Sequence, residues 1–124
     1  AINSGIAGLI VSNTTTKRDA GIENPLKTEM GGLSGRPLLG PSTELLSEMY
    51  VRTKGKIALI GVGGITSGSD AYNKICAGAS LVQLDTGLVY KGPKLVRRIK
   101  DDLATSLKQG GFNCVADAIG SQAK

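Results

Sequence analysis

Histidine and tryptophan are absent from this 124-residue chain, which holds one phenylalanine and two cysteines. Without histidine, these residues cannot form the Ser-His or Cys-His pairs that activate a nucleophile, and they show no zinc-ligand pattern. Cys76 and Cys114 are too few for a disulfide framework, so we expect both to be small buried hydrophobic residues in a reducing compartment. No metal site is expected, and the core has to be aliphatic.

Long apolar runs are also lacking. No stretch of the sequence approaches the roughly 20 apolar residues that span a bilayer. The chain begins at Ala1 with neither a methionine nor a basic-then-apolar signal segment. Such a start is typical of the interior of a longer protein, and we expect the chain to be truncated.

Acidic residues are outnumbered, with 10 Asp and Glu against 15 Lys and Arg, which gives a net charge of +5. Nucleic-acid binding is one interpretation of a basic chain. However, the basic residues are scattered, and their densest run, at 94–100, is followed by Asp101 and Asp102. No aromatic residues are interleaved with that run for base stacking. We therefore expect a solvated basic surface and no nucleic-acid partner.

Three short apolar runs, at 7–12, 57–62 and 80–84, predict buried strands. None of them alternates cleanly between apolar and polar residues. Continuous runs of this kind are typical of parallel strands that are buried on both faces.

Helical patterns separate and follow these runs. Ser42 is expected to cap a helix that reaches about residue 53. Ser67 opens a capping-box motif for a short helix that ends at Gly78. Pro93 suits the first turn of a third helix. The apolar stripe of this helix is Leu95, Ile99, Leu103 and Leu107, its end is the glycine pair 110–111, and a last helical turn is expected over 115–119.

The resulting order, β-loop-α-β-α-β-α, predicts an α/β fold with parallel strands and right-handed crossovers. Three strands cannot close a barrel, and they leave two unpaired edges and an open apolar face. A full (β/α)8 TIM barrel needs roughly 250 residues, about twice this length. We therefore expect residues 1–124 to be a partial domain, the C-terminal portion of a (β/α)8 TIM barrel with about three βα units.

Polar residues follow the first predicted strand directly, at Ser12, Asn13 and Thr14. Residues at the carboxyl ends of barrel strands face the active site. Asn offers both a donor and an acceptor, and Thr offers a hydroxyl, which suits a planar ring that carries C=O and N–H groups. An ordinary turn is the alternative interpretation, because Asn and Thr also favour turns.

Glycine makes up 18 of the 124 residues, about twice its ordinary share. It is dense at 31–38, where backbone N–H groups could approach an anion, although a flexible surface loop explains this segment equally well. The loops at 61–65 and 83–87 follow the second and third predicted strands. If these are the last two strands of a barrel, their loops form its standard phosphate site, with the bare amides of Gly63 and Gly64 and a helix N-terminus.

Together these stretches resemble one family. The segments are GLIVSNTT, GGLSGRPL, IGVGGITSGSDA, KICAGASLVQL and a terminal DAIG. In this order, and over essentially the whole chain, they resemble the class 2, quinone-linked dihydroorotate dehydrogenases. The tandem of GVGGI-x-SG-x-DA with AGASLVQ distinguishes this family from most phosphate-binding barrels. The surroundings of EMY and TKGK look more similar to the animal mitochondrial branch than to the bacterial one.

The resemblance implies an activity and a cofactor. The family oxidises dihydroorotate to orotate, passes a hydride to FMN and delivers the electrons to ubiquinone in pyrimidine biosynthesis. Asn13 and Thr14 match residues that hydrogen-bond the pyrimidine ring of the substrate. The positions matched to FMN binding are Ser12 beside the flavin, then Ser34, Gly35 and Gly63, and finally Gly64, Asp85 and Thr86 around the phosphate.

Several parts of the family have no counterpart in this chain. They are the serine that serves as catalytic base, the Lys and Asn residues near flavin and substrate, and the N-terminal helices that form the quinone tunnel and the membrane contact. We therefore assign no catalytic residue here and expect residues 1–124 alone to be inactive. The implied location is the mitochondrial inner membrane or, alternatively, the periphery of a bacterial cytoplasmic membrane.

Asp85 departs from the family pattern, which usually places Tyr or another aromatic or neutral residue next to the FMN phosphate. A carboxylate roughly 6 Å from each phosphate charge would cost about 3 kcal/mol at an effective dielectric near 20. The cost falls if the side chain points to solvent and only the backbone amide faces the phosphate.

Two other functions are compatible with the glycine loops. A different phosphate-binding barrel enzyme, such as an isomerase or aldolase, explains the loops but not the Asn13-Thr14 pair beside them. A non-catalytic fragment or basic binding module would have no reaction of its own.

Overall fold

A three-stranded parallel sheet forms the centre of the structure, a computed structural model that describes residues 2–18 and 22–124. Its strands are β1 (Gly8–Val11), β2 (Ala58–Val62) and β3 (Leu81–Gln83), in the order β1-β2-β3. Ile60 of β2 pairs with Ile10 of β1 and with Leu81 of β3. The three predicted strands and their parallel arrangement are therefore confirmed.

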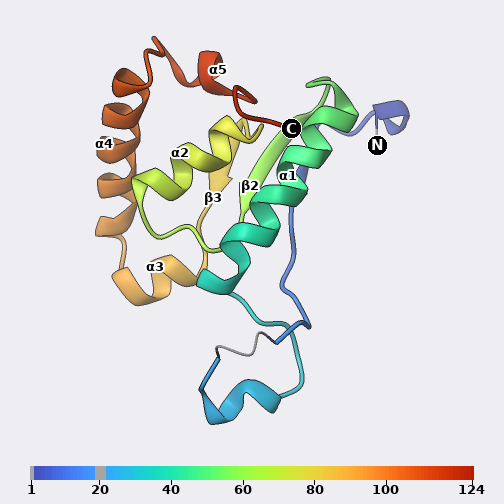
Figure 1. The fold of residues 1–124 in the computed structure, drawn as a ribbon, viewed down its shortest axis with the longest axis vertical. Coiled ribbons are helices and arrows are strands. Elements are labelled where there is room, and N and C mark those ends of the chain that lie inside the picture. The colour runs from blue at the N-terminus through green and yellow to red at the C-terminus, as the bar shows by residue number, and fades with distance from the viewer. Residues whose placement is uncertain (1, 19–21) are drawn as a thin grey trace.

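Among the described residues, two α-helices connect the strands and three follow the last one, and the longer helices gather on one face of the sheet (Figure 1). These five helices are α1 (Leu39–Thr53), α2 (Gly68–Cys76), α3 (Thr86–Lys91), α4 (Lys94–Gln109) and α5 (Val115–Ala118). Short 3-10 turns lie at η1 (Ile2–Ser4), η2 (Pro25–Thr28) and η3 (Arg36–Leu38). The loop that follows β1, together with α3, lies at the carboxyl end of the sheet (Figure 1).

The two faces of the sheet differ sharply in burial. On the helix-covered face, Val11 and Leu59 are 6% and 0% exposed. On the opposite face, Ile10 and Leu81 are 59% and 63% exposed. Successive strand residues point to opposite faces, so apolar side chains occupy both sides while helices cover one of them. The expected open apolar face is therefore present in this chain.

The start of α1 differs from the prediction. The helix begins at Leu39, directly after η3, so Ser42 lies inside its first turn and does not cap it. Ser42 is 2% exposed, and its hydroxyl donates a hydrogen bond to the Leu38 carbonyl at 2.6 Å. Ser is favoured at caps but also bonds back to a carbonyl one turn earlier, and the second behaviour holds here.

The predicted cap of α2 is confirmed. The Ser67 hydroxyl accepts a hydrogen bond from the Asp70 amide at 3.2 Å. In a capping box the Asp70 carboxylate would accept from the Ser67 amide. Here it accepts instead from the amide of the preceding residue, Thr66, at 2.9 Å. Gly78, at φ +121°, follows the end of this helix as expected.

The stripe of α4 and the turn of α5 also match the prediction. Leu95, Ile99 and Leu107 are buried and Leu103 is half-buried. The sequence did not predict α3, because a six-residue helix is too short to show an apolar period.

The two cysteines are both free, but only one is buried. Cys76 is 0% exposed and belongs to the main core. Cys114 is exposed at the start of α5, so its predicted burial is wrong. Cys114 directly precedes the short surface helix α5, where no other described element covers it. Composition alone does not reveal this position.

Candidate functional site

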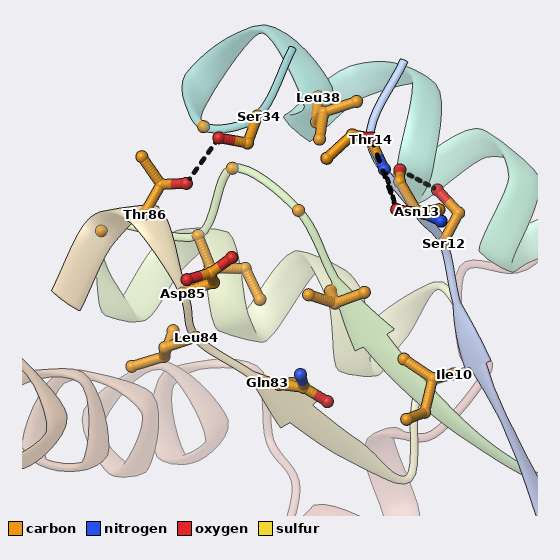
Figure 2. Close-up of a pocket in the computed structure, with 16 residues that line it drawn as sticks. Ile10, Ser12, Asn13, Thr14, Ser34, Leu38, Gln83, Leu84, Asp85 and Thr86 are labelled. Atoms are coloured by element: carbon orange, nitrogen blue, oxygen red, sulfur yellow. Dashed lines mark hydrogen bonds between the residues drawn. The ribbon is translucent and has the colours of Figure 1, made fainter. Parts of the chain in front are cut away.

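A pocket of about 370 Å³ lies at the carboxyl ends of the three strands (Figure 2). Loops after each strand contribute to its wall. The lining residues are Ile10, Ser12, Asn13, Thr14, Ser34, Gly35, Leu38, Val62, Gly63, Gly64, Ile65, Gln83, Leu84, Asp85, Thr86 and Gly87. All nine residues proposed from the sequence are in this set, although they span more than 70 positions of the chain.

Ser12, Asn13 and Thr14 leave β1 and line one side of the pocket (Figure 2). The Asn13 side-chain oxygen accepts a hydrogen bond from the Thr14 amide at 2.7 Å, which orients the carboxamide. Within the described part of the chain, the nitrogen of this carboxamide has no partner. The pair therefore offers a hydrogen-bond donor and a hydroxyl to a bound ring. The Val11–Ser12 peptide bond that precedes the pair is cis.

Gly63 and Gly64 form the corner after β2. Both have positive φ values, +106° and +72°. A Cβ at Gly64 would lie 2.7 Å from the Leu39 backbone nitrogen, and one at Gly63 would lie 2.8 Å from the Ser42 hydroxyl. The corner lies so close to α1 that only glycine can occupy these two positions. Their backbone therefore lines the pocket without side chains.

Two hydroxyl groups close the pocket on the side of β3. Thr86, the first residue of α3, donates a hydrogen bond from its hydroxyl to the Ser34 hydroxyl at 3.0 Å (Figure 2). Gly35, at φ +85°, lies against Thr86, since a Cβ there would be 3.1 Å from the Thr86 methyl carbon. Bare amides and paired hydroxyls are the donor set that proteins use for phosphate groups.

Asp85 brings a negative charge to the same wall. It occupies the position before α3, and its side chain makes no capping hydrogen bond to that helix. Figure 2 shows the carboxylate on the pocket wall between Leu84 and Thr86. The side chain lines the pocket and is exposed, so its charge lies on the pocket side and is partly screened by solvent.

An ion pair behind the pocket holds two of these loops together. The Arg36 guanidinium donates to the Asp70 carboxylate at 2.7 Å and joins η3 to the start of α2. Burial acts to raise the pKa of Asp70, but hydrogen bonds from Arg36, the Thr66 amide and Ser67 outweigh it and lower that pKa. Asp70 therefore remains a carboxylate, and the pair stabilises the position of the Gly63–Gly64 corner.

The pocket also contains residues for which the sequence pattern predicted no individual role, although all but Ile10 lie within the candidate segments 31–38, 61–65 and 83–87. They are Ile10, Leu38, Val62, Ile65, Gln83, Leu84 and Gly87. Gln83 is the chemically informative one, because it extends from β3 into the space that the loops enclose (Figure 2). A polar residue near the end of an apolar strand was the signal for it, and the alternation with Leu81 places both on the uncovered face.

Parallel strands, helices on one face and a pocket at the strands' carboxyl ends define the class of this fold: part of a (β/α)8 barrel, with the pocket at the face where such barrels bind ligands. A family model described as dihydroorotate dehydrogenase matches residues 1–107. The chain belongs to this family.

Relatives of the chain occur in animals, plants and bacteria. It is 55% identical over 116 residues to the mitochondrial dihydroorotate dehydrogenase (quinone) of Mus musculus, covering 94% of this chain and 29% of the mouse protein. It is 56% identical to the mitochondrial Arabidopsis thaliana protein, covering 92% and 25%. It is 52% identical to a Xanthobacter autotrophicus protein, covering 97% and 34%. The chain thus spans about a quarter to a third of these relatives, and the identities do not separate mitochondrial from bacterial branches.

Solved structures give the same fold. The ligand-free dihydroorotate dehydrogenase of Eimeria tenella superposes with a TM-score of 0.94 at 47% identity, over 99% of this chain and 34% of that one. A complex of the Eimeria enzyme with ferulenol gives 0.93 at 48% identity, over 97% and 32%. Among the residues that the structure describes, no helix combines the length and the hydropathy of a membrane span.

Proposed function

We propose that this chain is the C-terminal, cofactor-binding part of a quinone-dependent dihydroorotate dehydrogenase. The reaction is the oxidation of dihydroorotate to orotate in pyrimidine biosynthesis, with FMN as hydride acceptor and ubiquinone as final electron acceptor. The observation that carries the proposal is the convergence of all nine predicted site residues on one pocket. The names of the relatives support the substrate and the quinone.

FMN supplies the redox chemistry when it is bound, and this chain supplies its binding groups. The corner at Gly63 and Gly64 lines the pocket and carries no side chains, so its backbone is accessible to a phosphate. The Thr86 hydroxyl donates to the Ser34 hydroxyl, which leaves the proton of Ser34 as a donor for a ligand in the same pocket. The donor set therefore fits a phosphate monoester, with Ser12 and Gly35 nearer the ring system.

Asn13 and Thr14 are the proposed substrate ligands. A dihydropyrimidine carries both C=O and N–H groups, which a carboxamide and a hydroxyl recognise together. The bond between the Asn13 oxygen and the Thr14 amide holds the carboxamide in one orientation. Such fixed orientation contributes to the rate by placing the substrate ring correctly.

The open face of the sheet supports a partial domain. Ile10 and Leu81 are more than half exposed, and both outer strands have one free edge among the described residues. We propose that preceding strands and helices complete the barrel and contribute the catalytic base, the quinone site and the membrane contact. In that arrangement the protein is located at the mitochondrial inner membrane, or at a bacterial cytoplasmic membrane in the other branch. Residues 1–124 alone are then inactive.

The test uses the complete barrel, meaning this chain joined to the barrel segments that precede it. We expect a purified complete barrel to be yellow, with flavin absorbance at about 450 nm, and to reduce a quinone analogue when dihydroorotate is added. Asn13→Ala should lower kcat/KM by about 100-fold while the flavin content stays unchanged. Asn113→Ala, at an exposed position before α5, is the matched control.

Two results would contradict the proposal. A folded, colourless complete barrel that takes up no FMN would favour another phosphate-binding barrel enzyme, such as an isomerase or aldolase. Equal activity of the Asn13 and Asn113 variants would remove the substrate role of Asn13.

A further inference from the structure

Lys74 of α2 is the largest completely buried side chain in the described part of the molecule, with 0% exposure. Lysine is almost never fully buried unless it is paired. Its methylene chain passes over β2, since a Cβ added at Gly61 would lie 3.3 Å from the Lys74 Cδ atom. The ammonium group therefore lies behind the sheet, between α1 and α2.

One hydroxyl separates this ammonium from the pocket wall. The Lys74 Nζ donates a hydrogen bond to the Ser42 Oγ at 2.5 Å. Ser42 in turn donates to the Leu38 carbonyl at 2.6 Å, and its Oγ lies 3.5 Å from the Gly63 carbonyl. Leu38 and Gly63 both line the pocket. The buried charge thus stands directly behind the glycine corner.

The charge of Lys74 has little compensation from neighbouring side chains. Among the described residues, no carboxylate forms a salt bridge with it. Asp70 attracts it from one turn earlier on α2 but is itself bound to Arg36. Asp102 of α4 lies against Gly68, at the start of α2. Other neighbours of Lys74 are the Ser42 hydroxyl of α1 and the backbone of β2 at Gly61. Asp85 is the charged residue among those that line the pocket.

We propose that Lys74 is a positioning residue whose buried positive charge, acting through Ser42 and the Gly63 corner, favours binding of the doubly charged phosphate of the flavin nucleotide. The inference rests on the proposed function, because it assigns the phosphate to that corner. A cation that folding has already desolvated interacts with an anion more strongly than one in water. Lys74 therefore contributes attraction without touching the ligand.

The acid–base behaviour of Lys74 gives the proposal a distinct signature. Burial lowers the pKa of Lys74 to about 8, and the charge of Asp70 only partly opposes this. A bound phosphate favours the charged form and raises that pKa, so by linkage the charged form binds phosphate more tightly. Affinity for FMN should therefore be greatest below pH 8 and should fall as the pH rises beyond it. Further ionisation of the FMN phosphate, with a pKa near 6, would change affinity in the opposite direction.

The experiment compares FMN with riboflavin, which lacks the phosphate, on the complete barrel stripped of its flavin. Dissociation constants are measured by flavin fluorescence from about pH 6.5 to pH 9.5, around the proposed titration. We expect the preference for FMN over riboflavin to fall about tenfold across this range. Lys74→Met keeps the volume and removes the charge, and it should lower the preference about tenfold at neutral pH and flatten its pH dependence.

Controls distinguish this role from a purely structural one. Lys100→Met removes the same charge from an exposed position on α4 and should leave the dissociation constants of FMN and riboflavin unchanged. The urea midpoint of Lys74→Met should be equal to or above that of the unmodified protein, because the charge opposes folding. Equal losses for FMN and riboflavin would overturn the proposal, as would a preference of the unmodified protein that does not change with pH. Binding of neither ligand by the unmodified protein would instead overturn the proposed function.

Discussion

The loops after β1 and β2 meet in the same pocket, but they are held in different ways. The corner at Gly63 and Gly64 lies against Leu39 and the buried Ser42 of α1, and the buried ammonium of Lys74 donates to Ser42 from behind. In its described residues, the longer loop after β1 is mostly exposed and extends away from the sheet (Figure 1). The glycine corner of the proposed phosphate site is therefore built into the core, whereas Asn13, Thr14 and the phosphate-side Ser34 depend on surface contacts of the loop after β1.

A single side chain organises much of the second region. The Arg18 guanidinium donates hydrogen bonds to the carbonyls of Thr15 at 3.1 Å, Lys27 at 3.0 Å and Gly31 at 2.7 Å. Thr15 and Leu33 also pair through their backbones at 2.7 and 3.1 Å. These contacts hold the start of the loop, near Asn13, close to its end, the glycine segment that contains Ser34. Because most of these hydrogen bonds are exposed, we expect them to open more readily than the buried corner does.

The largest effect is expected from Gly64→Ala. A Cβ at this position would lie 2.7 Å from the Leu39 backbone nitrogen, and the φ of +72° is unfavourable for alanine. The change should destabilise the complete barrel by about 3 kcal/mol and weaken FMN binding at least 100-fold. Urea unfolding and flavin titration measure the two effects.

Gly40→Ala is the matched control for this change. Gly40 lies in the first turn of α1, and nothing is within 4 Å of a Cβ added there. Helix propensity favours alanine here, but Pro41 follows directly and disfavours a Cβ on a helical residue before it, so we expect a net change of at most about 1 kcal/mol. A Gly64 variant that binds FMN as well as the Gly40 variant does would show that the corner is not rigidly held.

A smaller and different effect is expected from Arg18→Ala. Loss of the guanidinium leaves several loop carbonyls to water, so the loop samples more arrangements while the glycine corner is undisturbed. We expect KM for dihydroorotate to rise about tenfold with the urea midpoint nearly unchanged. FMN affinity should fall less than KM rises, because Ser34 and Gly35 lie on this loop whereas the glycine corner does not. Arg98→Ala, at an exposed position of α4, provides the control. A loss of FMN affinity as large as the rise in KM would mean that the two regions are coupled and not separately supported.

The difference between the regions also explains what the sequence predicts. The three strands were predictable because each is a continuous apolar run between loops. The pocket residues were predictable because Ser12, Gly63 and Asp85 each follow one of those strands closely, and parallel strands bring their carboxyl ends together. The family resemblance added the roles of the residues, which spacing alone leaves open.

The supports behind the pocket were not predictable in the same way. Lys74 follows an ordinary helical pattern, and lysine is usually exposed, so its burial depends on how α1 and α2 pack over β2. Ser42 was interpreted as a cap because the turn at Arg36–Leu38, which starts the helix three residues earlier, has no apolar period. The partners of Arg18 are main-chain carbonyls, which leave no trace in the sequence.

The smallest effect is expected from Asp85→Tyr, which restores the kind of side chain that the family resemblance implies. The carboxylate lines the pocket near the glycine corner, where it repels a phosphate, but its exposure reduces the repulsion well below the value for a buried charge. We expect FMN to bind about fivefold more tightly in the tyrosine variant, with a similar gain for Asp85→Asn and no gain for riboflavin. A gain for tyrosine alone would assign the effect to the aromatic ring, whereas unchanged or weaker FMN binding in both variants would show that the charge of Asp85 is harmless at this site.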